Sequence, residues 1–407
     1  MIRVLWISSF VFDNSDESSS GVWQKTLFNE LNTCNDLILG NIGPTQSNQF
    51  QTSVYNNCKQ WALPKKKCKN GIPPRSVIDQ YESIIRDFKP DVVHIWGSEN
   101  FLKLLPFDER FDYKKVLVMQ GVLSTMAKFI FSGLSIADSI KTFRLREMLL
   151  GGSLFWEYKS FEKEGKLEMK MLNFSDHALV QSKWTSIQVK WINQNLPQTF
   201  VTRQLRPEFL EGKSWRFPEN HAVIFASCVG YSFKGLHVLI KALSLVKRKI
   251  PNVQLQLAAN QPNFGFLGVG YFKFINNLIN DLNLNDNIIW LGRLNAKDLL
   301  ERLIYSNVFV QPSFVESYSV AFAEAMAVGT PSVISYAGAM PELGTPNVEA
   351  LFFQPGDYST CANHILNIIS NPSLANELSE NAKIKSKSRT EMIDLKEIHR
   401  DLYKSFQ

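Results

Sequence analysis

The chain lacks any long apolar run. Although 45% of its 407 residues are hydrophobic, no stretch reaches the ~18–20 consecutive apolar residues that a membrane-spanning helix needs. Charged residues make up only 20% of the sequence, and low-complexity stretches are few, so the composition indicates a folded rather than a disordered chain. No repeat of solenoid period is present. A chain of this length is expected to form two domains of about 200 residues each.

Cysteine is scarce, and its pattern excludes two classes of protein. The five cysteines are odd in number and none shows the spacing of metal ligands: Cys34, Cys58, Cys68, Cys228 and Cys361. We therefore expect reduced thiols in a cytoplasmic protein rather than a disulfide framework or a zinc site. The start, MIRVLWISSFVF, lacks a small-residue cleavage site. It predicts a buried first strand rather than a signal peptide.

Signatures of nucleic-acid recognition are also missing. The net charge is +6, but no helix-turn-helix, zinc-finger or RNA-binding motif accompanies it, so no nucleic-acid partner is expected. The densest basic cluster is LPKKKCKNGIPPR, which holds Lys65, Lys66, Lys67, Lys69 and Arg75. A solvated loop is the favoured interpretation, and an attraction to anionic lipid or to an anionic acceptor is the alternative.

What the chain does contain is an alternation of apolar strands and helical segments. Strands are predicted in RVLWISSF, DVVHIWG, KVLVMQG, HALVQS, HAVIFAS, VQLQLAA, NIIWLG, VFVQPS, PSVIS and ALFFQ. Between them, LHVLIKALSLVKRK carries an apolar stripe of Leu236, Leu239, Ile240 and Leu243. This alternation predicts an α/β fold of two doubly wound parallel sheets. A polar, proline-containing stretch at 203–220 is the expected boundary.

Glu316 and Glu324 are the most informative residues. They lie in FVESYSVAFAEAMAVGTPSVIS, after an apolar strand and across the start of a small-residue helix. A helix N-terminus attracts a phosphate, and carboxylates beside it can accept hydrogen bonds from sugar hydroxyls. The spacing alone is weak, because chance Glu pairs are common. A carboxylate at Glu324 on an apolar helix nevertheless needs hydrogen-bond partners.

The segment QPSFVESYSVAFAEAMAVGTPSVISYAGAMPEL resembles the signature of family 4 of the retaining glycosyltransferases (glycosyl transferases group 1), which have the GT-B fold. That fold consists of two doubly wound Rossmann-like domains facing across a cleft. The resemblance implies an acceptor-side domain at 1–205 and a nucleotide-sugar-binding domain at 206–389. It also implies that a C-terminal helix at about 390–407 crosses back to the first domain.

Lys234 and Gly235, in GYSFKGLHVLIKAL, match the family's cationic position. A lysine there can neutralise a diphosphate leaving group, and a glycine lets the backbone approach closely; a solvated helix-start lysine is the alternative. Many relatives have an arginine about five residues earlier, but Val229 stands near that place. Three arginines were candidates to replace it: Arg203, Arg206 and Arg293.

The resemblance also implies contacts from the first domain. Gly21 would border the diphosphate, and Trp23 beside it would stack on a sugar or simply pack. Relatives often carry His-Gly where this chain has Gln120-Gly121, and glutamine can bind a hydroxyl but cannot serve as a general base. His94 matches another family position, with a structural role as the open alternative. Gln120, His94 and Trp23 are thus acceptor-side candidates.

The remaining donor contacts are inferred from matching segments. Gly292 and Arg293 lie where relatives contact the base, and the N–H groups around Ser319 and Val320 would face the diphosphate. Gly338 and Glu342 match the loop over the donor sugar, although Glu342 could instead be a charge at a helix N-terminus. The donor-binding set is therefore Glu324, Gly21, Gly235, Ser319, Val320, Gly292, Arg293, Gly338 and Glu342, and Lys234 and Glu316 are the catalytic candidates.

The resemblance implies a hexosyl transfer from a UDP- or GDP-sugar to a glycan or lipid-linked acceptor, in cell-surface polysaccharide synthesis. No cofactor and no metal are expected, because no Asp-x-Asp pair stands at a strand end. The aromatic and basic segment 126–161 has two open interpretations, a peripheral contact with the inner membrane surface or a buried or acceptor-facing helix. The alternatives are a non-catalytic nucleotide-sugar-binding protein, which the missing arginine and Gln120 leave open, and an epimerase or phosphorylase on the same fold, against which the context of Glu316 and Glu324 argues.

Overall fold

A computed structural model gives the fold of residues 1–13, 22–142, 153–203, 205–210, 213–227, 230–261, 270–391 and 394–407. These residues form two compact units. Unit 1 comprises 1–124, 163–204 and 393–407, and unit 2 comprises 125–162 and 205–392. The expected boundaries differ from this division at one segment, because 125–162 groups with unit 2. A hydrogen bond from Ser232 Oγ to the Ile130 carbonyl and an ion pair between Lys241 and Asp138 hold that segment there.

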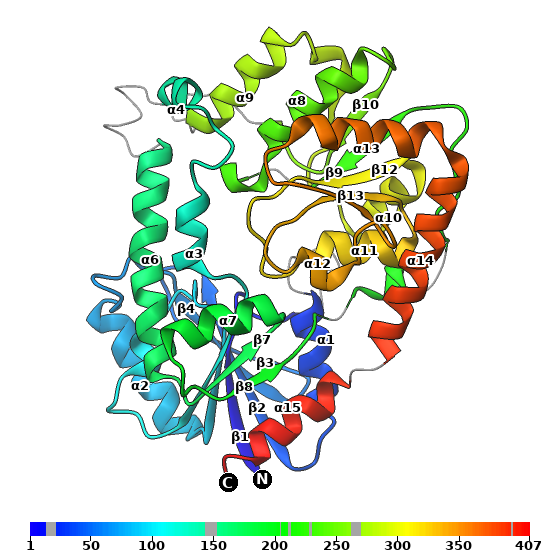
Figure 1. Ribbon diagram of the computed structural model, residues 1–407. Helices are drawn as coiled ribbons and strands as arrows, with labels where there is room; N and C mark the ends of the chain where they lie inside the picture. The colour runs from blue at the N-terminus through cyan, green and yellow to red at the C-terminus, as the bar shows by residue number, and fades with distance from the viewer. Residues whose placement is uncertain are drawn as a thin grey trace. The chain divides into compact units, whose positions relative to one another are not determined.

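Unit 1 is built on an eight-stranded sheet (Figure 1). Its spatial order is β3-β4-β2-β1-β5-β6-β7-β8, and every neighbouring pair is parallel except β3 with β4. The strands are β1 (Ile2–Ile7), β2 (Leu37–Thr45), β3 (Gln51–Tyr55), β4 (Cys58–Pro64), β5 (Val92–Trp96), β6 (Lys114–Val118), β7 (His177–Val180) and β8 (Gln198–Phe200).

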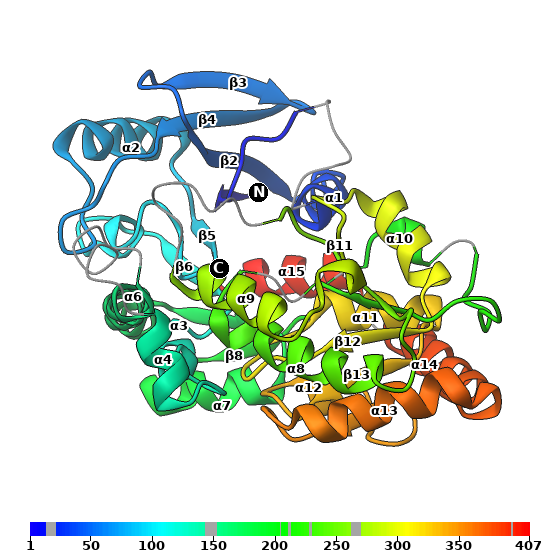
Figure 2. The same ribbon diagram turned by 90° about the horizontal axis from the view of Figure 1, so that it is seen from above.

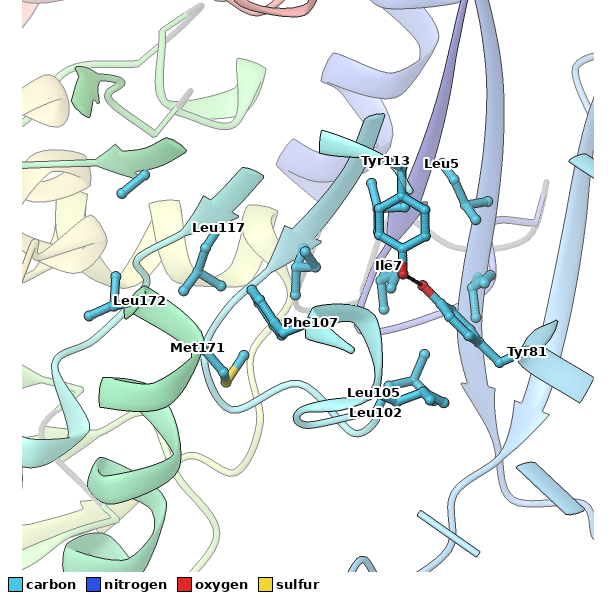
Figure 3. Packing of buried hydrophobic residues seen from close by; sticks show 14 of the residues in the cluster. Leu5, Ile7, Tyr81, Leu102, Leu105, Phe107, Tyr113, Leu117, Met171 and Leu172 are labelled. Carbon is cyan, nitrogen blue, oxygen red and sulfur yellow. Dashed lines mark hydrogen bonds between the residues drawn. The ribbon is translucent and has the colours of Figure 1, made fainter. Parts of the chain in front are cut away.

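Helices cover both faces of this sheet. They are α1 (Val22–Leu31), α2 (Arg75–Phe88), η1 (Leu105–Phe107), α3 (Leu123–Met126), α6 (Leu154–Phe174), α7 (Lys183–Ile192) and α15 (Leu395–Lys404). The ends of α3 and α6 pass into unit 2. One core packs α2, η1, α6 and α7 on the sheet, and a second packs α1 and α15. Figure 3 shows the first core, in which the buried hydroxyls of Tyr81 and Tyr113 are hydrogen-bonded at 2.7 Å.

Unit 2 contains a six-stranded, all-parallel sheet in the order β11-β10-β9-β12-β13-β14. Its strands are β9 (Val223–Ala226), β10 (Gln254–Leu257), β11 (Ile288–Trp290), β12 (Val308–Gln311), β13 (Ser332–Ser335) and β14 (Leu351–Phe353). They are short, and β9 and β14 are continuous apolar runs, as expected for strands that are buried on both faces. This confirms the two-unit, parallel α/β fold class that the strand and helix alternation predicted.

The helices of unit 2 lie on both sides of its sheet, with α8 and α13 on one face and α10 and α11 on the other (Figure 1). They are η2 (Ala127–Phe129), α4 (Ile136–Thr142), η3 (Pro207–Phe209), η4 (Ser232–Lys234), α8 (Leu236–Lys247), α9 (Gly270–Asp281), η5 (Asn285–Asn287), α10 (Ala296–Tyr305), α11 (Val320–Val328), α12 (Met340–Leu343), α13 (Tyr358–Ser370) and α14 (Pro372–Glu391). The predicted stripe of α8 (Leu236, Leu239, Ile240 and Leu243) is fully buried.

Candidate functional site

The topology of unit 2 defines where a ligand is expected. From β9 the chain builds β10 and β11 on one side, and it then returns to place β12, β13 and β14 on the other. The neighbours β9 and β12 therefore form the switch point, and open parallel sheets bind ligands beyond the carboxyl ends of the strands there. The segment after β9 leads to Lys234, and the segment after β12 leads to Glu316.

Lys234 and Glu316 meet at this switch point. Lys234 Nζ lies 2.7 Å from Glu316 Oε1. The same oxygen accepts hydrogen bonds from Gln311 Nε2 at 2.8 Å and from Ser313 Oγ at 2.9 Å. The Glu316 side chain is only 5% exposed, whereas that of Lys234 is 30% exposed. The lysine is thus held in place by a buried carboxylate and still reaches solvent.

Ser319 joins this network to the start of α11. Its hydroxyl accepts a hydrogen bond from the Phe322 amide at 3.1 Å, which makes it the N-cap, and donates to Gln311 Oε1. The amides of Val320 and the residue after it have no acceptor within the helix. The first turn of α11 therefore presents N–H groups and a partial positive charge beside Lys234 and Glu316, an arrangement suited to a diphosphate.

Two glycines allow the backbones of this site to approach closely. Gly235 has φ +77°, and a Cβ there would lie 2.0 Å from the carbonyl oxygen of Pro312. Gly338 has φ +55°, and a Cβ there would lie 2.1 Å from the carbonyl oxygen of Glu316. That carbonyl also accepts a hydrogen bond from the Ala339 amide at 2.9 Å. Both glycines therefore contact the segment that carries Glu316, as its predicted neighbours should.

Glu324 is paired with an arginine. It lies on α11 with only 2% of its side chain exposed, and its Oε1 receives Arg206 Nε at 2.9 Å and Nη2 at 2.8 Å. Burial raises the pKa of Glu324 to about 7, while Arg206 opposes this rise and Glu208 adds to it. Of the three arginines considered as replacements, Arg206 is the one placed against a predicted donor-binding carboxylate.

The other donor candidates of unit 2 are more exposed. Gly292, with φ +76°, and the exposed Arg293 follow β11, the edge strand of the sheet. A pocket of about 320 Å³ lies beside that strand, lined by Gln261, Ile275, Asn276, Ile279, Asn285, Ile288 and Trp290. Glu342 is exposed in the short helix α12. These positions leave the predicted contacts of Gly292, Arg293 and Glu342 with a donor as predictions.

The candidates in unit 1 differ in whether the structure describes them. Gly21 lies outside the described residues, and so does the side chain of Trp23. Val229, near the place of the missing arginine, is also outside them. Gln120 is half-buried just beyond the carboxyl end of β6. Its role with an acceptor stays a prediction.

His94 is a core residue rather than a surface residue. It is fully buried on β5, and its Nδ1 lies 2.7 Å from the hydroxyl of Tyr403 on α15. Its ring also packs 4.4 Å from that of Trp96. Burial, with nearby His399, holds the pKa of His94 well below its usual range, so the ring is neutral. The structure therefore supports the structural alternative for His94 and corrects its placement on the acceptor side.

Two residues of the site were not predicted from the sequence. Gln311 and Ser313 bind Glu316 directly, yet they lie in a stretch that was interpreted only as the end of a strand and a turn. The available signal was a polar amide closing the otherwise apolar run Val308–Val310. A buried glutamine at a strand end must find hydrogen-bond partners, and in this chain those partners are Glu316 and Ser319.

Within the described ranges, no three His, Cys, Asp or Glu side chains gather where they could hold a metal ion. Three cysteines there are free thiols: Cys34, Cys58 and Cys68. No helix among the described residues is long and apolar enough to cross a membrane.

Comparison with known proteins gives a family match for part of the chain. The sequence model of the glycosyl transferases group 1 matches residues 210–385. D-inositol 3-phosphate glycosyltransferase from Pseudarthrobacter chlorophenolicus is 29% identical over 123 residues, which are 30% of this chain and 28% of that protein. The chain spans less than half of the length of the first curated relatives that it matches.

Solved structures resemble the whole chain. Sucrose-phosphate synthase from Thermosynechococcus elongatus covers 100% of both chains with a TM-score of 0.73 and 16% identity. Alr3699/HepE from Anabaena, solved in complex with UDP-glucose, covers 96% of both chains with a TM-score of 0.66 and 14% identity. These likenesses confirm the GT-B fold class. By its residues 210–385, the chain is similar to the glycosyl transferases group 1.

Proposed function

We propose that the chain is a retaining glycosyltransferase that moves a hexosyl group from a nucleoside-diphosphate sugar to an acceptor hydroxyl. The observation that carries this proposal is the ion pair of Lys234 and Glu316 at the β9–β12 switch point, next to the capped N-terminus of α11. A cation, helix amides and buried carboxylates together suit a diphosphate, a ribose and a hexose.

Each residue has a role in this mechanism. Lys234 and the amides at the start of α11, around Ser319 and Val320, stabilise the negative charge that develops on the leaving diphosphate. Glu324 accepts hydrogen bonds from the ribose hydroxyls. Glu316 uses Oε1 to hold Lys234 and Gln311, so we assign its second oxygen to the donor sugar. Gly235 and Gly338 keep the backbones close enough to form this crevice.

We propose retention from the resemblance to the retaining glycosyltransferases, and the contacts of Glu316 bear on the path by which it would occur. Glu316 is engaged by Lys234, Gln311 and Ser313, which suits a binding role better than that of a covalent nucleophile. Enzymes that retain configuration through a glycosyl-enzyme need two opposed carboxylates. We therefore favour a front-face, oxocarbenium-like path in which the departing diphosphate takes the acceptor proton. No cofactor and no metal take part in the proposed reaction.

For the donor we propose a base, and for the acceptor a chemical class. The likeness to a protein solved with UDP-glucose favours UDP over GDP as the first base to test. For the acceptor we propose a glycan or lipid-linked hydroxyl in cell-surface polysaccharide synthesis. A cytoplasmic location with peripheral contact at the inner membrane surface would suit such an acceptor.

The direct test follows release of the sugar from UDP- and GDP-hexoses in the presence of EDTA, because many transferases slowly pass their donor to water. We expect release of the nucleoside diphosphate, with the α-anomer of the sugar appearing first in the NMR spectrum. Glu316→Gln should abolish this signal, and the exposed-site variant Glu342→Gln serves as a milder control. A first product of inverted configuration would refute retention. Donor binding without any release would favour the non-catalytic alternative.

A further inference from the structure

We propose that unit 1 carries a surface that binds anionic lipid, formed by the outward sides of α6 and α7. This α6–α7 surface comprises Lys163, Lys166, Met169, Lys170 and Phe174 on α6, and Lys183, Ile187, Lys190 and Trp191 on α7. It rests on the proposed function, which includes a peripheral membrane contact, and it names the residues that would make this contact. All of them belong to unit 1, whereas the donor residues within the described part of the chain belong to unit 2.

The outward stripe of α7 exposes apolar side chains that a soluble helix normally covers. Its exposed positions 183, 187, 190 and 191 recur at helical spacing, opposite the buried Thr185, Ser186 and Val189. Trp191 is 85% exposed, and Ile187, one turn earlier, is 51% exposed. Tryptophan is the residue most typical of the membrane–water interface. A tryptophan this exposed beside another apolar side chain indicates a binding surface.

Helix α6 repeats the same composition. Met169 and Phe174 are both more than 40% exposed, and Lys163, Lys166 and Lys170 are exposed around them. The two helices touch at their carboxyl ends, where Asn193 Nδ2 donates to the Leu172 carbonyl at 3.2 Å. Figure 1 shows the carboxyl end of α6 beside α7, and Figure 2 shows the same helices from above. The apolar and lysine residues therefore form one region rather than two separate ones.

The charge of the α6–α7 surface indicates the kind of partner that it binds. Between 163–174 and 183–194 the only acidic residues are Glu164 and Glu168. Glu164 is paired with Lys103 at 2.8 Å. Glu168 is buried, where it accepts hydrogen bonds from Ser98 and from the Leu123 amide. Five exposed lysines thus surround the apolar residues without an exposed carboxylate, which complements a negatively charged bilayer.

Two other candidate surfaces lack one part of this combination. The lysine cluster at 65–69 is exposed, but its exposed large apolar neighbour is Ile72 and no aromatic side chain accompanies it. Helix α4 exposes Ile136 and Ile140, but it carries the acidic Asp138 and it ends where the described residues stop at 142. Of these three surfaces, the α6–α7 surface is therefore the one that unites apolar, aromatic and basic side chains.

The test is cosedimentation of the full chain with vesicles of phosphatidylglycerol and phosphatidylcholine, compared with phosphatidylcholine alone. We expect binding to the anionic vesicles, which weakens as salt is added. Replacing Ile187 and Trp191 by Ser should weaken it at least about tenfold. Lys170→Gln with Lys190→Gln should weaken it about 30-fold, at about a fivefold loss per lysine.

Matched controls separate this surface from a general effect of charge or hydrophobicity. Val54→Ser removes an exposed apolar side chain from the edge strand β3, and Lys65→Gln with Lys66→Gln removes two exposed lysines. Both controls should bind vesicles like the unchanged chain. Every variant should keep its rise in melting temperature with UDP-glucose, so a failure of donor binding and a failure of lipid binding are recorded separately.

Three results would overturn the proposal. One is a chain that stays in the supernatant with anionic vesicles. Another is equal loss of binding in the 65–66 control and in the 170–190 variant. The last is a dimer in light scattering that dissociates in the Trp191→Ser variant, because a second copy of the chain would then cover α7.

Discussion

Lys234 is the residue on which the proposed chemistry depends most. Its Nζ lies 2.7 Å from Glu316 Oε1, and its side chain is still partly exposed. It can therefore contact a diphosphate without a rearrangement of the surrounding core. Arg206 offers a second cation, but it is committed to Glu324. Lys234 and Arg206 thus each pair with one of the two predicted carboxylates. Two positive charges are therefore present among the predicted site residues, although Val229 stands near the place where the family has an arginine.

Replacement of Lys234 by Ala should slow the reaction strongly. One lost electrostatic contact to a developing oxyanion costs about 2–4 kcal/mol of transition-state stabilisation, which is about a 30- to 1,000-fold fall in kcat/KM. The measurement is steady-state release of nucleoside diphosphate from the preferred donor. Lys249→Ala, at an exposed lysine beyond α8, is the control and should retain full activity. Equal rates for the two variants would refute the role of Lys234.

Glu324 should make donor binding depend on pH near neutrality. Its pKa in the folded chain is about 7, above the ordinary 4.5. The protonated carboxyl group therefore contributes to the free energy of unfolding below pH 4.5, and this contribution is lost as the pH rises through 7. Ribose hydroxyls need the ionised carboxylate as acceptor, so affinity for UDP-glucose should increase about tenfold from about pH 6 to about pH 8.

Calorimetric titration of UDP-glucose at several pH values measures this increase. The sugar nucleotide is suitable because its diphosphate has no ionisation in that range. Glu324→Gln should flatten the profile, and Arg206→Met should move it to higher pH, because Arg206 lowers the pKa of Glu324. A pH profile that is the same in all three proteins would contradict the assignment of Glu324 to the ribose.

At the scale of elements, the apolar runs predicted most of the strands correctly. Runs such as HAVIFAS and VFVQPS became β9 and β12, because continuous apolar residues are what a strand buried on both faces requires. The strands β2, β3, β4 and β8 were not predicted. Strand β2 contains Gly40, Gly43 and Pro44, which are signals of turns. Strand β3 is an exposed edge strand, so neither shows the expected pattern.

The site was predicted in part for a similar reason. The lysine, the two glutamates and the glycines were recognisable from local patterns and from the family resemblance. The pairing of Arg206 with Glu324 joins residues 118 positions apart, and it depends on how the chain enters unit 2. The burial of His94 depends on Tyr403, which lies 309 positions later in the sequence. Local patterns do not encode such contacts.

The loop between β9 and α8 should tolerate no side chain at Gly235. A Cβ there would meet the Pro312 carbonyl at 2.0 Å, and φ is +77°. Gly235→Ala should cost about 1–3 kcal/mol of stability and should weaken donor binding, because Lys234 is displaced from Glu316. Gly356→Ala is the matched control, since its φ of +91° is also positive but a Cβ there would meet its nearest neighbour, the Phe314 ring, at an ordinary 3.4 Å. Equal unfolding midpoints and donor affinities for the two variants would argue against the close approach.

At the scale of the whole molecule, the chain passes between its two units several times and ends in unit 1. Helix α15, the last helix, packs in the core of unit 1. Tyr403 accepts a hydrogen bond from Trp6 Nε1 at 3.2 Å and lies 2.7 Å from His94 Nδ1. Arg400 and Lys404 pair with Asp36 at 2.9 Å and 3.1 Å. The last residues of the chain are thereby joined to its first strand.

Tyr403→Phe tests how much the hydrogen bonds of Tyr403 stabilise unit 1. It would leave the buried Trp6 Nε1 and His94 Nδ1 without the tyrosine hydroxyl, and an unsatisfied buried group costs about 1–3 kcal/mol. Urea unfolding followed by tryptophan fluorescence should show an earlier transition, since Trp6 lies in that core. Tyr358→Phe, at a partly exposed tyrosine, should unfold like the unchanged chain. An unshifted transition in Tyr403→Phe would show that α15 is held by its other contacts.

The central claim is that unit 2 holds a nucleotide-sugar site made by Lys234, Glu316 and Glu324. The most direct test is the melting temperature of the purified chain with a panel of nucleoside diphosphates and their sugars, in the presence of EDTA. The account predicts that one nucleotide raises the melting temperature and that Glu324→Ala abolishes the rise. No stabilisation by any member of the panel, or a rise that persists in Glu324→Ala, would contradict it.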